Sequence, residues 1–172
     1  MRKPFAQKGS QMTIAAMLDA AAMLDTFCRA VERREGRKLA ALFTEDGVYH
    51  DVFYGAFAGR PAIAKLVDDN FYRTARDFRW DMHDPVSDGK TLYARYSFSY
   101  VSTLPEAAGK RVGFAGVAIM SLRENMIASY REIANVGPAL VALNFAPARV
   151  CKILGKEGGA LMRDPDMARH FS

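Results

Sequence analysis

The amino-acid sequence predicts an α+β fold in which helices come first and an antiparallel sheet follows. Three observations support this prediction. The first part of the chain places apolar residues at helical spacing, the middle has several segments with the alternation of strands, and the end is apolar and helical again. A run of helices followed by a meander of strands is typical of α+β domains, whereas parallel sheets alternate strands with helices.

The N-terminal part is predicted to hold three helices after a loose arm of residues 1–11. Gly36 is expected to end the first helix, because glycine favours the backbone conformation that follows a helix. Pro61 marks the start of the third, since proline is favoured at the first helical position. The helices are expected over residues 12–35, 37–43 and 61–73.

The strands are predicted from β-branched and aromatic residues bounded by turn signals. A first strand precedes the third helix, and the others follow it as a meander. Asp88 and Gly89 form a tight hairpin signal between two of the meander strands. The expected strands cover residues 48–52, 78–86, 91–101, 111–122 and 126–135.

The C-terminal part is helical from Val136, with a break expected at Gly155, Gly158 and Gly159. We expect a main domain over residues 12–145 and a helical extension over residues 146–172. The apolar residues between positions 139 and 154 are too many to stay exposed. They are expected to pack over the mouth of the sheet or on a neighbouring subunit.

Composition excludes several classes of protein. The chain has 172 residues, of which 50% are hydrophobic, which suffices for one domain with a real core. Its formal charge of +5 is mild and its basic residues are scattered, so a nucleic-acid partner is not expected. No run approaches the ~20 apolar residues of a membrane span. Two cysteines without a ligand pattern predict neither a disulfide framework nor a metal site, and they favour the cytoplasm.

Alternation along the strands selects the candidate site residues. Tyr49 and Asp51 share one face of the first strand, so a phenol and a carboxylate point into any cavity there. In the strand 91–101, Arg95 shares a face with small hydroxyls, and Glu132 in the last strand is its natural partner. A buried group of Asp51, Arg95 and Glu132 would shift the pKa of each carboxylate by desolvation and charge, and would separate acid from base roles.

The other face of the strand 91–101 carries Tyr96, Phe98 and Tyr100. Three alternating aromatic residues exceed what a solvated strand face usually carries. We therefore expect this face to lie outside the cavity and to form a homodimer, with the C-terminal helices as the competing cover.

The order of these elements resembles the nuclear transport factor 2-like superfamily, and within it the SnoaL-like proteins and limonene epoxide hydrolase. The resemblance covers residues 12–145 and rests on LFTEDGVYHD, AGRPAI, the DG hairpin, GKRVGFAGVAIM, the REN turn and SYREIANVGPALVAL. It implies a curved sheet wrapped by three helices into a cone with one deep pocket, and often a dimer across the outer sheet face.

Three enzyme groups of this superfamily have catalytic residues that this sequence matches only in part. By resemblance to the epoxide hydrolases, Tyr49, Asp51, Arg95 and Glu132 fall at catalytic places. Asp51 stands where an Asn holds the water, and Ser97 stands where the acid would be, so Asp51 would have to donate the proton.

By resemblance to the ketosteroid isomerases, Asp51 would abstract the proton. Phe27 replaces a family Tyr, and the strand with the second donor offers Gly116 and Ala118, so the oxyanion hole is missing. The Asp–His pair of the dehydratases is replaced by Glu32 and Phe78.

Structural roles are the alternative for each residue. Arg95 and Glu132 can form an ion pair that only supports the fold, Tyr49 can belong to the core, and Asp51 can bond backbone amides at a turn. Under that interpretation the domain binds a ligand or dimerises without catalysis.

The sequence favours a small-molecule enzyme with water-assisted or proton-transfer chemistry on a cyclic apolar or polyketide-like substrate. Its expected class is hydrolase, cyclase or isomerase, with no metal or organic cofactor. Glu132 or Asp51 would be the base, Arg95 the polarising group and Tyr49 a hydrogen-bond donor. The expected substrate-binding residues are Phe27, Tyr54, Phe78, Trp80, Tyr93 and Ser97.

Overall fold

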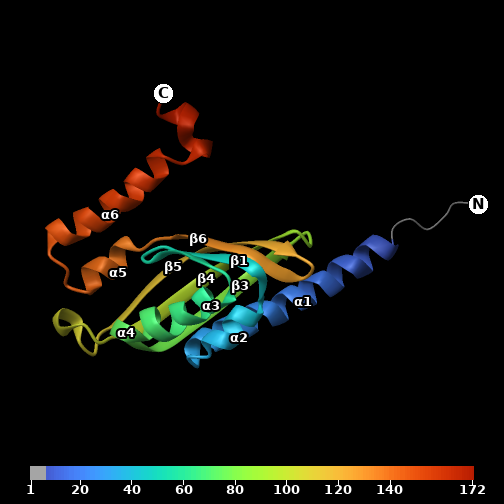
Figure 1. The fold of residues 1–172 in the computed structure, drawn as a ribbon, viewed down its shortest axis with the longest axis horizontal. Helices are drawn as coiled ribbons and strands as arrows, with labels where there is room; N and C mark the ends of the chain where they lie inside the picture. The colour runs from blue at the N-terminus through green and yellow to red at the C-terminus, as the bar shows by residue number, and fades with distance from the viewer. Residues whose placement is uncertain (1–6) are drawn as a thin grey trace, which may run out of the picture.

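A curved six-stranded sheet forms the centre of the molecule (Figure 1). The computed structural model describes the backbone of residues 7–172 and the side chains of residues 19–172. The strands in sheet order are β2 (Gly55–Ala58), β1 (Phe43–Asp51), β6 (Met126–Ala134), β5 (Arg111–Arg123), β4 (Thr91–Ser102) and β3 (Ala75–Ser87). The predicted α+β class is confirmed.

One pairing departs from the expected antiparallel sheet. β1 runs parallel to β6, and every other neighbouring pair is antiparallel. The strands from β3 to β6 are joined consecutively by short turns, which forces opposite directions on neighbours. β1 meets β6 only after the chain has passed through the helices and the meander, so no hairpin fixes their relative direction.

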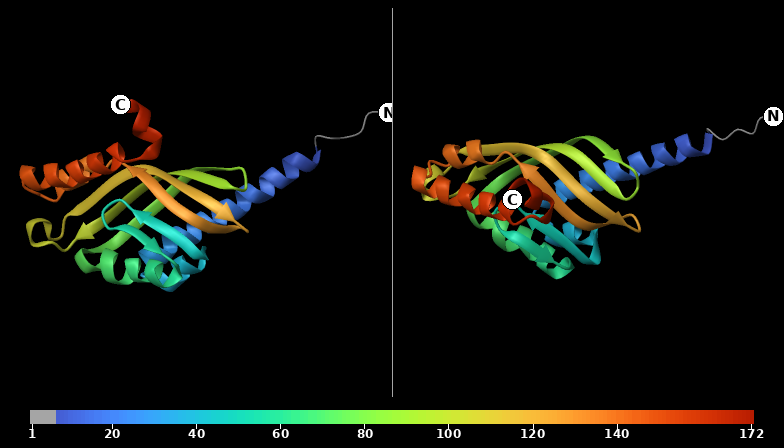
Figure 2. Two further views of the ribbon diagram at one scale, coloured as in Figure 1. Left: turned by 45° about the horizontal axis from the view of Figure 1, so that its top comes forward. Right: turned by 90° about the horizontal axis from the view of Figure 1, so that it is seen from above.

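The N-terminal helices cover the concave side of the sheet (Figure 2). The longest of them, α1, packs along β3. The third predicted helix is a continuous helical stretch whose middle, Leu66–Phe71, is a π-helix. The helices are α1 (Gln7–Glu32), α2 (Gly36–Ala41), α3 (Arg60–Lys65) and α4 (Tyr72–Thr74). α1 therefore includes residues 7–11 of the predicted arm, whereas residues 1–6 lie outside the described part.

Gly36 has a different role from the one predicted. It opens α2 and does not terminate α1, which ends at Glu32. A Cβ atom at Gly36 would lie 2.4 Å from the carbonyl oxygen of Ala64. Only glycine therefore allows α2 to approach α3 this closely.

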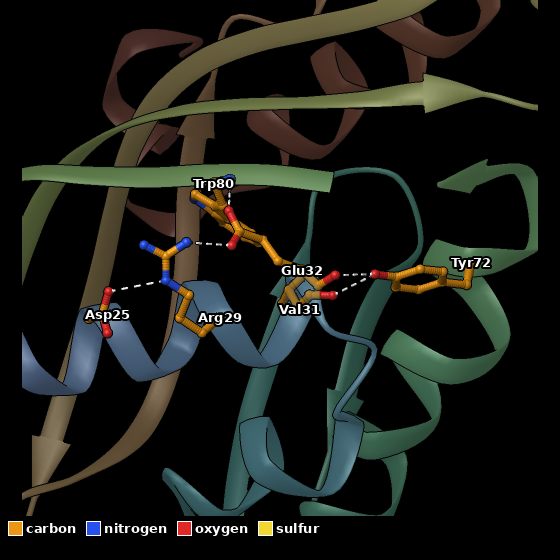
Figure 3. Close-up of polar contacts among 6 residues, drawn as sticks. All are labelled: Asp25, Arg29, Val31, Glu32, Tyr72 and Trp80. Carbon is orange, nitrogen blue, oxygen red and sulfur yellow. Dashed lines mark hydrogen bonds and ion pairs between the residues drawn. The ribbon is translucent and has the colours of Figure 1, made fainter. Parts of the chain in front are cut away.

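Polar contacts attach the end of α1 to its neighbours (Figure 3). The Glu32 carboxylate accepts a 2.8 Å hydrogen bond from the backbone N–H of Trp80 and a second, also 2.8 Å, from Arg29. The Tyr72 hydroxyl donates to the carbonyl oxygens of Val31 and Glu32 at 3.0 and 2.8 Å. Because β3 is an edge strand, the Glu32 contact also satisfies a backbone donor that no neighbouring strand can reach.

The concave face of the sheet carries the aromatic set of β4, contrary to the prediction. Tyr96 is buried, and Phe98 and Tyr100 are partly buried against the core. Arg95 lies on the opposite, outer face and is exposed. Alternation correctly separated the aromatic set from the set that contains Arg95. The prediction was wrong about which of the two sets faces inward. Burying the aromatic set stabilises the core, whereas burying Arg95 would cost the desolvation of a charge.

The C-terminal part forms two helices and a final 3-10 turn. α5 (Gly137–Ala142) packs on the chain around Pro105–Ala107 through Ala139 and Leu143. α6 (Pro147–Met162) continues through its three glycines, so the predicted break is wrong. It contains no buried residue, and Figures 1 and 2 show it above the sheet, on the side opposite to the N-terminal helices. Among the described residues, no helix is long and apolar enough to cross a membrane.

Candidate active site

A cavity of about 80 Å³ opens inside the curved sheet. The sheet supplies Tyr49, Trp80 and Glu132, and the turn after β1 supplies the rim through Phe53 and Tyr54. Half of the remaining lining is aromatic. The space exceeds what one water molecule needs several-fold, so a small ligand group fits within it.

Glu132 is the carboxylate of the cavity wall. It follows Tyr130 by two residues on β6, so both side chains point to the concave face. The Tyr130 hydroxyl donates to the Glu132 carboxylate at 3.1 Å. Burial raises the pKa of Glu132 to about 7, and the negative charge of Asp51 adds to the rise, while the phenols of Tyr96 and Tyr130 partly offset it.

Two further phenols lie buried close to this carboxylate. The ring of Tyr49 packs 4.4 Å from that of Tyr130. Among the described residues, neither the Tyr49 nor the Tyr96 hydroxyl makes a hydrogen bond of full geometry, although Tyr96 faces the Glu132 carboxylate. Burial, then the nearby charge of Glu132, raises the pKa of Tyr49 and of Tyr96. Both therefore stay protonated at neutral pH and can donate to a ligand or water.

Gly116 makes room for one of these hydroxyls. A Cβ atom there would lie 2.7 Å from the Tyr96 hydroxyl oxygen and 2.4 Å from the carbonyl oxygen of Ile133. In the sequence, Gly116 suggested that a donor was missing from this strand. The structure shows instead that a donor from β4 occupies the space above it.

Asp51 bonds backbone amides at a turn, as the structural alternative for this residue predicted. One of its carboxylate oxygens accepts hydrogen bonds from the backbone N–H groups of Phe53 and Tyr54, both at 2.9 Å. These bonds fix the turn at the rim of the cavity. Burial raises the pKa of Asp51, although the two backbone N–H groups oppose the shift. Asp51 lines the same cavity as Glu132.

Arg95 does not contact Glu132, so that prediction is wrong. Its guanidinium bonds to Asp84 on the outer face at 2.9 and 2.6 Å. Ser97 and Tyr93 lie on the same outer face, with Ser97 3.5 Å from a ring nitrogen of His83. None of these three side chains lines the cavity, because their strand positions alternate with the buried aromatic set.

The other predicted site residues lie in or beneath the cavity. Tyr54, Phe78 and Trp80 line it, whereas Phe27 is fully buried below it and stacks 5.1 Å from the ring of Tyr130. Glu32, which stands at a position of the dehydratase Asp–His pair, instead accepts hydrogen bonds from Arg29 and from the backbone of Trp80.

Sequence reasoning missed Tyr96 and Tyr130. Tyr130 could have been found, because its spacing of two from Glu132 places both side chains on one strand face. Tyr96 required the correct choice between the two faces of β4.

The site consists of protein groups suited to proton transfer. Within the described residues, no three His, Cys, Asp or Glu side chains are arranged to hold a metal ion. A carboxyl group with a pKa near neutrality, surrounded by phenol donors in an apolar cavity, can accept a proton from one atom and return it to another. The phenols can meanwhile stabilise negative charge on a ligand oxygen.

Comparison with known protein families finds a match for this chain. A family model for the SnoaL-like domain matches residues 24–130, which is more than half of the chain. The matched region ends at Tyr130, just before Glu132, and leaves α5 and α6 outside it. No curated protein matches the sequence.

Solved structures share the fold at low sequence identity. A putative polyketide cyclase from Xanthomonas campestris is similar with a TM-score of 0.61 and 20% identity, covering 74% of this chain and 98% of its own. An epoxide hydrolase of Mycobacterium tuberculosis has a TM-score of 0.59 and 17% identity, covering 80% and 97%. TsrD from Streptomyces laurentii has a TM-score of 0.64 and 16% identity, covering 73% and 95%.

Proposed function

Because the chain belongs to the family of SnoaL-like domains, we propose that it is a small-molecule enzyme that transfers protons on a cyclic apolar or polyketide-like substrate. The observation that carries this proposal is Glu132, a carboxyl with its pKa near 7 beside three buried phenols. A group that titrates near the working pH is present both as base and as acid, which is the optimum for general acid–base catalysis.

Each residue of the site has a role in this proposal. Glu132 removes a proton from the substrate, or from a water molecule that attacks it. Tyr130 orients the carboxylate through its hydrogen bond. The hydroxyl of Tyr49, which lines the cavity, donates to the substrate oxygen that gains negative charge. Tyr96, outside the cavity lining, keeps a phenol next to the Glu132 carboxylate. Asp51 holds the rim turn, and its charge helps to keep the pKa of Glu132 high.

Isomerisation or cyclisation fits this geometry better than epoxide opening through a carboxylate–arginine–carboxylate arrangement. The arginine of that arrangement would be Arg95, whose side chain pairs with Asp84 on the outer face. The names of the similar structures, a polyketide cyclase and an epoxide hydrolase, support a reaction on a cyclic or ring-closing substrate. Hydrolysis by a water that Glu132 activates is the second candidate, supported by the unpartnered phenol hydroxyls, which can hold that water.

An exchange assay tests the proton-transfer step without knowledge of the natural substrate. Cyclohexanone in D₂O is monitored by NMR for loss of its α-protons, with wild type compared to Glu132→Gln. We expect wild type to accelerate exchange with an inflection near pH 7, and the variant to lose the acceleration by about a hundredfold or more. Glu124→Gln, at an exposed position in the turn between β5 and β6, is the matched control.

Two outcomes would contradict the proposal. Full exchange activity in Glu132→Gln would show that this carboxyl is not the base. Binding of cyclohexanone without any accelerated exchange would favour the alternative, a ligand-binding domain without catalysis.

We further propose a homodimer through the outer sheet face. The aromatic residues that first suggested it lie on the concave face, but the outer face presents other apolar side chains. Tyr93, Val117 and Ile133 are 47%, 36% and 71% exposed, and Val117 pairs directly with Ile133 across β5 and β6. The N-terminal helices already cover the concave face, so a second copy is the proposed cover for this one.

The domain limits and location are also proposals. We assign residues 12–145 to the SnoaL-like domain and residues 146–172 to an extension. Cys28 and Cys151 are both free thiols, which supports a reducing compartment such as the cytoplasm.

A further inference from the structure

A second cavity lies against the candidate active site and is built partly by the C-terminal helices. Its volume is about 260 Å³, and α5 and α6 contribute Leu140, Leu143 and Ile153 to its wall. It shares Phe53 and Tyr54, among others, with the lining of the inner cavity. We call this space the vestibule. A ligand seated at Glu132 that is larger than the inner cavity would extend into it.

Specific contacts hold the turn between α5 and α6, next to the vestibule, against the chain around Glu106. Lys110 donates to the side chain of Asn144 at 2.8 Å, and Asn144 donates to the backbone carbonyl of Glu106 at 2.9 Å. Beneath these bonds, Ala139 and Leu143 pack in a small separate core with Ala107. The wall is therefore a built part of the fold, although the residues of α5 and α6 lie outside the region that matches the SnoaL-like domain.

The charges of the vestibule are of one sign. Its charged lining residues are Arg73 of α4 and Arg149 of α6. Arg149 is fixed 3.6 Å above the ring of Phe145 and pairs with Glu106 at 3.1 Å. Among the residues whose side chains are described, no carboxylate lies within ion-pair distance of Arg73. The vestibule thus carries two guanidinium groups against one neighbouring carboxylate.

We propose that the vestibule binds the anionic end of the substrate, with Arg73 as its principal contact. This inference rests on the proposed function and narrows its substrate class to a cyclic apolar body linked by a short chain to a carboxylate. The aromatic inner cavity takes the ring, and the apolar wall from α5 and α6 takes the chain. Arg73 receives the carboxylate, for which a guanidinium offers paired donors of matching geometry.

The chain contains its own reporter of binding. Trp80 is the single tryptophan of the sequence and lines the inner cavity. Its fluorescence therefore responds when a ring enters. The matched probes are 5-cyclohexylpentanoate and 5-cyclohexylpentanamide, which share ring, chain and shape but differ in charge.

Titration of the full chain with both probes tests the inference at neutral pH, where the acid probe is ionised. We expect wild type to bind the carboxylate about tenfold more tightly than the amide. Arg73→Gln should reduce this preference to less than about twofold without changing the affinity for the amide, and Arg73→Lys should restore part of it. Added salt should weaken only the carboxylate.

The control is Arg76→Gln, a nearby exposed arginine that pairs with Asp77 and lies outside the vestibule. It should keep the full preference. Equal affinity of wild type for the two probes would overturn the inference, as would failure of both to change Trp80 emission, or a preference that survives Arg73→Gln.

These failures are distinct from failure of the proposed function. If the carboxylate preference is missing while Glu132→Gln still abolishes proton exchange, the vestibule proposal is wrong and the enzyme proposal stands. If the preference is present while Glu132→Gln exchanges protons normally, the binding site stands without the catalytic role.

Discussion

At the scale of single residues, the surroundings of Glu132 explain why this carboxyl differs from the other acids of the chain. Burial of Glu132 away from water raises the free energy of its charged form, and the negative charge of Asp51 raises it further. Tyr130 and Tyr96 oppose this effect by donating to, or facing, the carboxylate. The balance leaves the pKa about 7, where a small change in the cavity moves the group between acid and base.

The raised pKa of Glu132 has a consequence for stability. Its folded value of about 7 exceeds the ordinary value of 4.5, so the folded state binds the proton more strongly than the unfolded state. The resulting stability is fully present below about pH 4.5 and is lost as the pH rises through 7. Glu132→Gln removes this dependence, because an amide stays neutral.

We therefore expect the unfolding free energy of wild type to fall by about 2–3 kcal/mol relative to that of Glu132→Gln when the pH rises from about 5 to about 8. Urea unfolding of both proteins at the two pH values measures this change. The unfolding free energy of Glu124→Gln should fall as that of wild type does. A difference between Glu132→Gln and wild type that stays constant with pH would show that the carboxyl is not held in its protonated form.

At the scale of secondary-structure elements, the end of α1 positions β3 and so one wall of the cavity. Glu32 and Tyr72 attach the helix to the edge strand and to α4, and Trp80 of the cavity wall is one of the attached residues (Figure 3). Glu132, the proposed base, lies on the distant strand β6. The width of the cavity thus depends on contacts made far from the proposed chemistry.

Tyr72→Phe tests this attachment. The Tyr72 hydroxyl serves two carbonyl oxygens, so its loss should lower the unfolding free energy by about 1–2 kcal/mol. The matched control is Tyr54→Phe, whose hydroxyl makes one long contact of 3.4 Å with the carbonyl of Asn70. We expect its change to stay within about 0.5 kcal/mol. Equal stabilities of the two variants in denaturant titration would contradict the role of Tyr72.

The elements also show how far the sequence could predict this molecule. Periodicity and turn residues predicted the main helices and the meander strands, because these signals are local. They missed β2, placed the start of β1 five residues late and did not predict the break between α5 and α6. The choice of inward face on β4 is not local, since both sets of side chains alternate perfectly. Only packing against other strands, here on Trp80 of β3 and Phe114 of β5, decides between them. The same error misplaced Arg95 and Tyr96 together and hid the phenol group around Glu132.

Glycine was misinterpreted for a related reason. Gly155, Gly158 and Gly159 carry a cost in a helix of about 1 kcal/mol each, yet α6 continues through them. Gly36 and Gly116 matter because another chain segment approaches each closely. Such approaches appear only when distant parts of the fold are brought together.

At the scale of the whole molecule, two apolar surfaces have no cover in the single chain. One is the outer sheet face with Val117 and Ile133. The other lies on α6, where Leu154, Leu161 and Met162 are exposed. A helix that contains no buried residue gains little stability by itself. Both surfaces are therefore candidates for burial against a second copy. Substitutions on the sheet face test the proposed dimer most directly.

We expect the wild-type chain to sediment at micromolar concentration with twice its mass of 19.1 kDa. Ile133→Glu and Val117→Glu should each shift the protein toward the monomer, because an unpaired carboxylate would be desolvated in the interface. Val141→Glu is the control, since this residue is 67% exposed and belongs to α5, not to the sheet. A wild-type monomer would rule out the dimer, and a dimer that survives Ile133→Glu would place the interface elsewhere, with α6 as the next surface to substitute.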